Sequence, residues 1–228
     1  MDLEKNTDHG TVGVNIKKVS DIEKTMLIVQ KSNHKIHYNP HVNYLVLPLQ
    51  FGNGTYYISL YRRVSEKKNL YSLLDKISLS VNMRDVNAYM LYPNYIVNYN
   101  QNMEVIQNIT KLVEGCRTEK EKYGVIKKYI KEHFIYDYIY AIDRKRKQPF
   151  PSSIENCYKT KKGVCLDLAT LATALFRSQG IKAQFVAGKA DGSPHAWVYV
   201  YVDGQKILYD PTAALMQISI KKITYLKI

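Results

Sequence analysis

Three residues near the C-terminal end have the types and local settings that thiol catalysis requires. Cys165 lies at the predicted start of a helix, His195 opens an apolar strand, and Asp210 ends the next strand. A cysteine nucleophile, a histidine general acid/base and a carboxylate that orients the histidine ring together form a Cys-His-Asp triad. The sequence therefore predicts an enzyme whose catalytic residues are Cys165, His195 and Asp210.

The predicted position of Cys165 favours its reactivity. In the first turn of a helix, the positive end of the helix dipole stabilises a thiolate, and a nearby imidazolium stabilises it further. The backbone N–H of such a residue has no partner within the helix, so it can bind an oxyanion. The sequence does not identify a second oxyanion donor. Asp167, in the same turn, is favourable for the helix dipole and need not be catalytic.

The predicted contact between His195 and Asp210 depends on one hairpin. If Asp203-Gly204 form a two-residue turn, Trp197 faces Asp210 across the two strands and His195 faces Thr212. Asp210 is then a diagonal neighbour of His195 on the same face of the sheet, within reach of its side chain. A register change of one residue would move Asp210 to the opposite face.

Residues 1–92 are predicted to form a β-rich accessory domain. Short β-prone segments follow one another at 12–16, 26–29, 36–38, 44–49, 55–61 and 77–81. Asn53-Gly54 predicts a hairpin between the segments 44–49 and 55–61, because these residues tolerate positive φ angles. Several short strands at this spacing predict a small sandwich or barrel-like domain.

Residues 93–228 are predicted to form the catalytic domain, with helices followed by strands. Apolar residues at helical spacing predict helices from Ile106 to Val113, from the capping box at Thr118 onward, and from Val164 to about Ser178. Strands are predicted at 183–187, 195–202, 205–209 and 218–226. The order of helices and then an antiparallel sheet indicates the α+β class.

The chain is strongly basic, with 33 Lys and Arg against 20 Asp and Glu and a formal net charge of +13. Such a balance favours anionic partners, among them nucleic acid, anionic lipid and acidic cell-wall polymer. The charge is spread along the chain, and its one dense run, at 144–147, accompanies no nucleic-acid motif. We interpret the charge mainly as a solubilising surface, predict no specific nucleic-acid binding, and leave an anionic cell-wall polymer open as a partner.

The remaining cysteines and the histidines indicate neither a disulfide framework nor a metal site. Cys116 lies in a predicted connection between helices, and Cys157 is interpreted as a small buried hydrophobic residue. A group of three histidines in the β-rich part lacks supporting acidic ligands: His34, His37 and His41. We therefore predict no metal and no cofactor.

The N-terminal residues contain no apolar run, and no stretch of the sequence is long enough to span a bilayer. The sequence alone predicts either a cytosolic protein or one whose leader has been removed from the chain.

The C-terminal part of the sequence resembles the transglutaminase-like superfamily of papain-like folds. The resemblance covers about residues 93–215. Within this range, the segment 133–138, which precedes the cysteine, resembles bacterial members in particular. The matching blocks lie at 133–138 (HFIYDY), 161–169 (KKGVCLDLA), 175–183 (LFRSQGIKA), 195–198 (HAWV) and 210–212 (DPT). More loosely, the β-rich front, with residues 47–54 (LPLQFGNG), resembles the accessory region of surface-exposed bacterial members.

This resemblance implies a helix carrying Cys165 that packs on an antiparallel sheet. It also implies attack of Cys165 on an amide or ester carbonyl with formation of a thioester, proton transfer by His195, and orientation of that ring by Asp210. The expected substrate is a peptide or protein, and the expected location of a bacterial surface-type member is secreted or at the cell surface.

Three functions remain open at this point. The first is a thiol-dependent peptidase or amidase, in which water accepts the acyl group. The second is protein-glutamine acyl transfer to an amine, which forms crosslinks and uses the same triad. The third is a non-catalytic binding module, held at a cell surface by its basic charge, in which the thiol has lost its role.

Overall fold

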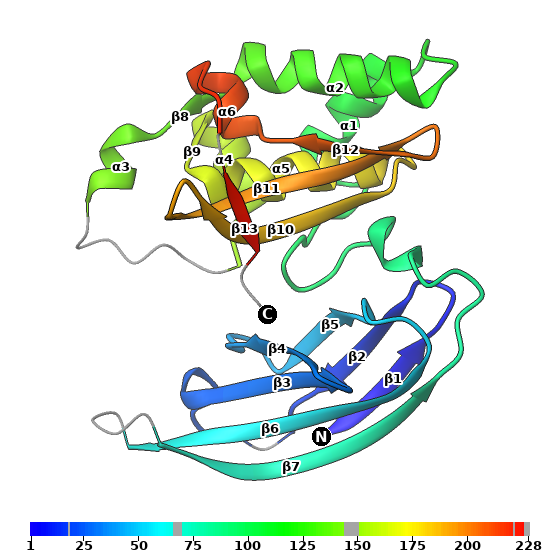
Figure 1. Ribbon diagram of the computed structural model, residues 1–228, viewed down its shortest axis with the longest axis vertical. Helices are drawn as coiled ribbons and strands as arrows, with labels where there is room; N and C mark the ends of the chain where they lie inside the picture. Colours follow the sequence, from blue (N-terminus) through cyan, green and yellow to red (C-terminus); the bar gives the residue numbers. More distant parts are fainter. Residues whose placement is uncertain (18, 66–69, 144–150, 221, 226–228) are drawn as a thin grey trace. The chain divides into compact units, whose positions relative to one another are not determined.

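The computed structural model describes residues 1–228 except for 18, 66–69, 144–150, 221 and 226–228 (Figure 1). The basic run at 144–147 therefore lies outside the described residues. The chain divides into two compact units, Met1–Tyr89 and Met90–Lys227. None of the described helices combines the length and the apolar character needed to cross a membrane.

The first unit consists of two antiparallel sheets, which confirms the predicted β-rich character of this part of the chain. The strand order is β1-β2-β5 in one sheet and β4-β3-β6-β7 in the other (Figure 1). The strands are β1 (Asp2–Asn6), β2 (Thr11–Asn15), β3 (Thr25–Lys31), β4 (His34–Tyr38), β5 (Tyr44–Pro48), β6 (Gly54–Ser65) and β7 (Leu70–Val81), with a 3₁₀ helix at Ile22–Lys24. Buried apolar side chains occur on strands of both sheets.

The hairpin predicted at Asn53-Gly54 is wrong. Strand β5 pairs with β2, whereas β6 pairs with β3 and β7, so the turn carries the chain from one sheet to the other. The buried Tyr56 hydroxyl closes the turn by accepting from the N–H of Phe51 at 2.9 Å and contacting the carbonyl oxygen of Leu49 at 2.9 Å. A glycine-rich turn fixes a change of direction, but not which strands pair across it.

The second unit combines six helices with an antiparallel sheet in the part of the chain that the structure describes, which confirms the α+β class. The sheet order is β12-β11-β10-β13, and β8 and β9 form a separate parallel pair. The elements are α1 (Glu104–Val113), α2 (Glu119–His133), β8 (Ile135–Tyr136), α3 (Tyr138–Ile142), α4 (Ile154–Thr160), β9 (Lys162–Gly163), α5 (Cys165–Ser178), β10 (Ala183–Ala190), β11 (Ser193–Val202), β12 (Gln205–Tyr209), α6 (Pro211–Met216) and β13 (Ile223–Tyr225).

The sequence signals for the three longer helices are confirmed. Thr118 and Glu121 form the predicted capping box of α2: the threonine hydroxyl accepts from the N–H of Glu121 at 3.1 Å, and the glutamate carboxylate accepts from the N–H of Thr118 at 3.2 Å. Helix α5 ends before Gly180, which has the positive φ of +78° that favours glycine after a helix. The helices that were not predicted, α3, α4 and α6, have only five to seven residues each.

Helix α5 is the centre of this unit. Every residue from 168 to 177 is buried, and the helix contacts α1, α2, α4 and α6 as well as the strands β10 and β11. In Figure 1 the helix runs along one face of the sheet. Its one buried charge, Arg177, donates from Nε to the carbonyl oxygen of Ala183 at 2.8 Å and from Nη1 to that of Tyr92 at 2.9 Å. These hydrogen bonds offset the cost of burying the guanidinium.

Gly188 of β10 allows close packing beside the strand that carries His195. A Cβ at this position would lie 2.5 Å from the Trp197 ring and 2.6 Å from the carbonyl oxygen of Thr224 on β13. Both distances are far below van der Waals contact, so any side chain would displace the indole or the edge strand.

We expect Gly188→Ala to lower the free energy of unfolding by about 1–3 kcal/mol, because it overpacks this contact. Trp197 is the single tryptophan of the chain, so its fluorescence reports both the unfolding transition and any displacement of the ring. Gly124→Ala in α2 is the matched control: nothing lies within 4 Å of its added Cβ. Alanine has the higher helix propensity, so this variant should gain about 0.5–1 kcal/mol. Equal effects of the two substitutions would contradict the proposed close packing at Gly188.

Candidate active site

The predicted hairpin between β11 and β12 is confirmed. Asp203 and Gly204 have φ angles of 50° and 77°, the combination that a type I′ turn requires. The ladder between β11 and β12 runs from Val202 opposite Gln205 to Val198 opposite Tyr209, which is the predicted register. The turn therefore fixes the register of β12, and with it the position of Asp210, which directly follows this strand.

Beyond Tyr209 the prediction is only partly correct. The pairs predicted between Trp197 and Asp210 and between His195 and Thr212 are not part of the ladder, because the chain turns into helix α6. Proline has no N–H to give to a ladder, and it is favoured in the first turn of a helix. Asp210 is instead the N-cap of α6, and its Oδ1 accepts from the N–H of Ala213 at 2.9 Å.

His195 and Asp210 nevertheless meet. The Nε2 atom of His195 lies 2.6 Å from Oδ2 of Asp210, and the two side chains are only 13% and 4% exposed. The two oxygens of this carboxylate thus have separate roles, since Oδ1 caps α6 and Oδ2 holds the imidazole. The ring of Trp197 stacks beside the imidazole, with centroids 6.2 Å apart. The imidazole is therefore held by the Asp210 carboxylate and by the Trp197 ring, and the carboxylate is held by the imidazole and by the N–H of Ala213.

Cys165 completes the group. It is the first residue of α5, and its partly exposed side chain lies near enough to His195 to affect the pKa of the imidazole. Because Asp210 contacts Nε2, the nitrogen left to face the thiol is Nδ1. The structure thus brings together the side chains of Cys165, His195 and Asp210, which come from a helix N-terminus, a strand and a helix cap.

The Asp210 carboxylate, which accepts from the ring, and next Cys165 raise the pKa of His195 to about 9, with burial acting in the opposite direction. The imidazole is therefore protonated and positively charged at neutral pH. A positive charge next to a cysteine attracts a thiolate, which is the nucleophilic form of the side chain.

Asp167 fixes the start of the helix that carries the cysteine. Its Oδ2 accepts from the N–H of Val164 at 3.0 Å, and its Oδ1 accepts a short hydrogen bond from the hydroxyl of Ser152. Gly163 allows this approach, since a Cβ there would lie 2.7 Å from the Cβ of Asp167. The contacts agree with the structural role given to Asp167 from the sequence. Ser152 was not identified, because nothing in its local sequence distinguishes it from other loop serines.

Tyr136 is a second residue beside the cysteine to which the sequence gave no individual role. Strand β8 pairs with β9 so that Tyr136 lies opposite Gly163, two residues before Cys165. The N–H of Asp137 donates to the carbonyl oxygen of Gly163 at 3.0 Å and extends this pairing. Burial raises the pKa of the Tyr136 hydroxyl, and the charge of Cys165 raises it further.

The other two cysteines have surroundings that differ from those of Cys165. Cys157 is 2% exposed in the core between α4 and α5, as the sequence predicted. Burial, followed by the negative charge of Asp167, raises the pKa of its thiol to about 12. Cys116 is partly exposed in the connection between α1 and α2, and all three cysteines are free thiols.

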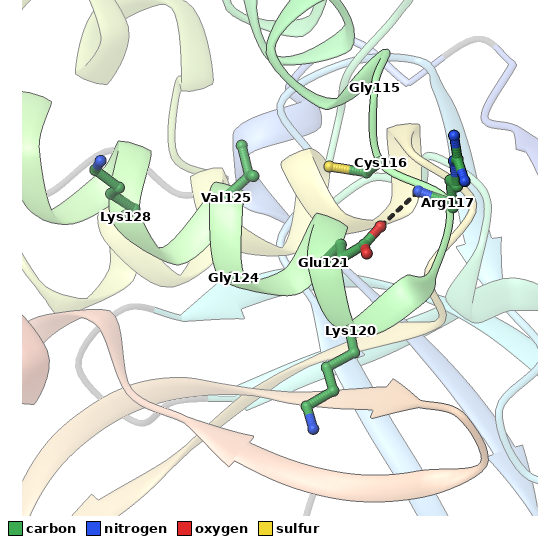
Figure 2. Close-up of a pocket in the computed structure, with 8 residues that line it drawn as sticks. All are labelled: Gly115, Cys116, Arg117, Lys120, Glu121, Gly124, Val125 and Lys128. Atoms are coloured by element: carbon green, nitrogen blue, oxygen red, sulfur yellow. Dashed lines mark hydrogen bonds between the residues drawn. The ribbon is translucent and has the colours of Figure 1, made fainter.

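A surface cleft of about 610 Å³ lies beside Cys116 and does not include the triad (Figure 2). Its lining comes from the α1–α2 connection and from α2: Gly115, Cys116, Arg117, Lys120, Glu121, Gly124, Val125 and Lys128. The carboxylate of Glu121 is engaged at the start of α2, where it accepts from the N–H of Arg117 at 2.6 Å. We assign the candidate active site to the triad and not to this cleft.

Among the described residues, no group of three or more His, Cys, Asp or Glu side chains could hold a metal ion. Of the three histidines considered from the sequence, His34 and His37 lie on β4 and His41 follows that strand. His34 stacks on Phe51, with ring centroids 5.4 Å apart.

A protein-family model described as "Transglutaminase-like superfamily" matches residues 107–211, which include Cys165, His195 and Asp210. This chain contains a transglutaminase-like domain. The resemblance noted in the sequence is thereby confirmed at the level of the superfamily, and so is its fold, with the cysteine helix packed on an antiparallel sheet.

Several solved structures are similar to the chain. A structure described as a TGase has 25% sequence identity and a TM-score of 0.42; the similarity covers 49% of this chain and 31% of that one. The periplasmic domain of TgpA from Pseudomonas aeruginosa has 11% identity and a TM-score of 0.46, over 93% of this chain and 90% of that one. Red sea bream transglutaminase has 11% identity and a TM-score of 0.39, over 89% and 48%. No match to a curated protein was found.

The raised pKa of His195 predicts a pH dependence of stability. A folded-state pKa of about 9, above the ordinary value of 6.5, means that the protonated ring stabilises the fold. This contribution is complete below about pH 6.5 and is lost as the pH rises through 9. Between these values we expect the free energy of unfolding to fall by about 2 kcal/mol more in the wild type than in His195→Gln. Urea titrations across this range measure the difference, and parallel curves would contradict it.

The surroundings of the cysteines predict selective alkylation. Iodoacetamide at neutral pH should modify Cys165 before Cys157, because Cys157 is buried and its thiol pKa is raised. His195→Ala should slow the modification of Cys165 by removing the neighbouring cation, and it should leave the partly exposed Cys116 unchanged. Peptide mass spectrometry after timed quenching measures each rate. A rate at Cys165 that does not respond to His195→Ala would show that the two side chains do not form an ion pair.

Proposed function

We propose that the protein is a thiol-dependent peptidase or amidase, in which Cys165 is the nucleophile, His195 the general acid/base and Asp210 the residue that orients the imidazole. The observation that carries this proposal is the contact of the Asp210 carboxylate with the ring of His195, together with the position of Cys165 beside that ring at the start of α5. Such a triad performs nucleophilic acyl transfer on unrelated folds. We propose a peptide or protein as the substrate.

The geometry supports a reaction in two stages. In the first, the thiolate sulfur of Cys165 bonds to the substrate carbonyl carbon, and the carbonyl π electrons move to oxygen. When the carbonyl re-forms, the carbon–nitrogen bond breaks, and the amine leaves with a proton from the imidazolium of His195. The product of this stage is a thioester on Cys165.

In the second stage, His195 removes a proton from water, and the water oxygen adds to the thioester carbonyl. Collapse of this adduct releases a carboxylic acid and returns the thiolate. An amine in place of water would yield an amide by the same steps, which is the crosslinking alternative. The bound Oδ2 of Asp210 holds the ring in position for both transfers.

An active-site titration with p-nitrophenyl acetate tests this proposal. We expect a burst of nitrophenolate and an acetyl group on the peptide that contains Cys165. Cys165→Ala should abolish the burst, and Asp210→Ala should slow acylation, because the imidazole loses the carboxylate that orients it. Cys116→Ala is the control, since this partly exposed thiol lies outside the triad.

The outcomes separate the alternatives that the sequence left open. Release of acetate in water supports hydrolysis, whereas preferential formation of an acetamide with an added lysine analogue supports acyl transfer. A folded wild-type protein without a burst, but with salt-sensitive adhesion to an anionic polymer that persists in Cys165→Ala, would replace the enzyme with the binding module.

A further inference from the structure

The chain that leads into helix α5 turns sharply at Lys161. This residue follows α4 with φ and ψ angles of 57° and 20°, in the left-handed region of backbone conformation. Glycine and asparagine are the residues usually found there after a helix, because a Cβ makes the conformation costly. A lysine held in this conformation, four positions before Cys165, therefore points to a contribution from its side chain.

The side chain of Lys161 brings a cation into contact with two aromatic rings. Its Nζ atom lies 3.4 Å from the centroid of the Tyr158 ring and 5.4 Å from that of Phe134, both within the range of cation–π attraction. Phe134 is 2% exposed and Lys161 is partly buried, so water screens this attraction less than on an open surface. The ammonium thus joins α4, which carries Tyr158, to the end of α2, where Phe134 directly precedes β8.

The Tyr158 ring is itself held in position by α1. Its hydroxyl donates to Oε1 of Glu104 at 2.9 Å and accepts from Nδ2 of Asn108 at 2.6 Å. Burial lowers the pKa of the Lys161 ammonium, and the charge of Glu104 acts in the opposite direction. Cation, ring and carboxylate therefore form one cluster that lies outside the triad and links α1 to α4.

The backbone of Lys161 holds the residue that follows Phe134. Its carbonyl oxygen accepts from the N–H of Ile135 at 3.0 Å, at the start of the pairing between β8 and β9. This pairing ends at Gly163, two positions before Cys165. The side chain and the carbonyl of one residue thus fix two consecutive residues of the facing segment, and with them the path of the chain into α5.

We propose that Lys161 is a positioning residue whose ammonium, through its two aromatic contacts, holds Cys165 in place beside His195. It acts through the backbone of β9 and is not itself a catalytic residue. This inference rests on the proposed function, since a nucleophile and its general base must lie at a fixed distance. Misplacement by about 1 Å can slow a reaction by about 10²-fold.

Lys161→Met and Lys162→Met are the matched variants, because each replaces one ammonium with an unbranched apolar side chain. Lys162 is the next residue and is exposed on β9. We expect Lys161→Met to slow acylation by p-nitrophenyl acetate by about 10- to 10²-fold, with little change in KM, and Lys162→Met to acylate at the wild-type rate. Lys161→Arg should restore most of the rate, since a guanidinium also binds aromatic faces.

Alkylation of Cys165 by iodoacetamide provides a readout that a role in stability alone would not change. In the wild type, His195→Ala should slow this alkylation. In Lys161→Met the same substitution should slow it much less, because the two side chains of the site no longer meet. Lys161→Gly is a second variant, which removes the ammonium and favours the backbone conformation. It should stay folded even if Lys161→Met does not, and it should show the same slow acylation.

Each outcome decides between the possible roles. Slow acylation in Lys161→Gly, rescue by Lys161→Arg and a weakened response to His195→Ala support the inference. Acylation of Lys161→Gly at the wild-type rate overturns it and leaves the proposed function standing. Equal effects of Lys161→Met and Lys162→Met, or slow acylation with an unchanged response to His195→Ala, also overturn it, since charge or stability would then be the cause. If the wild type never acylates, the proposed function fails, and the role of Lys161 fails with it.

Discussion

The second unit depends on the burial of helix α5. Residues 168–177 are all shielded from water, so the helix must be covered by other helices and by the sheet, and it cannot rotate or slide without exposing apolar surface. Arg177 adds a directional constraint, because its buried guanidinium donates to the carbonyl oxygens of Tyr92 and Ala183, and losing these hydrogen bonds would be costly. The N-terminus of this fixed helix is where Cys165 meets its partners.

The site is assembled by short, specific contacts around that fixed point. Asp167 and Ser152 hold the entry into the helix, and the β8–β9 pair brings a second segment of the chain to the same place. Asp210 caps α6 with one oxygen and holds His195 with the other. The carboxylates of Asp167 and Asp210 therefore cap helices and also position the catalytic side chains, so a change at either helix start would also move the site.

Sequence reasoning reached the parts of this arrangement that short-range signals encode. Glycine at 204 predicted the turn and register of the β11–β12 hairpin, and the capping box at Thr118 predicted the start of α2. It failed where pairing depends on distant segments: the turn at Asn53 joins two different sheets, and the place of Tyr136 depends on a two-residue parallel pair with Gly163. Neither partner is visible in the neighbouring sequence.

The β11–β12 hairpin has a consequence for protein engineering. Its two-residue turn sets the number of residues between His195 and Asp210, so the length of the hairpin determines whether these two side chains meet. Inserting a single residue in either arm would turn the following side chains to the other face of the sheet, even if the strand stayed fully paired. A loop library or an affinity tag placed at this tip should therefore lengthen the turn itself and leave both arms untouched.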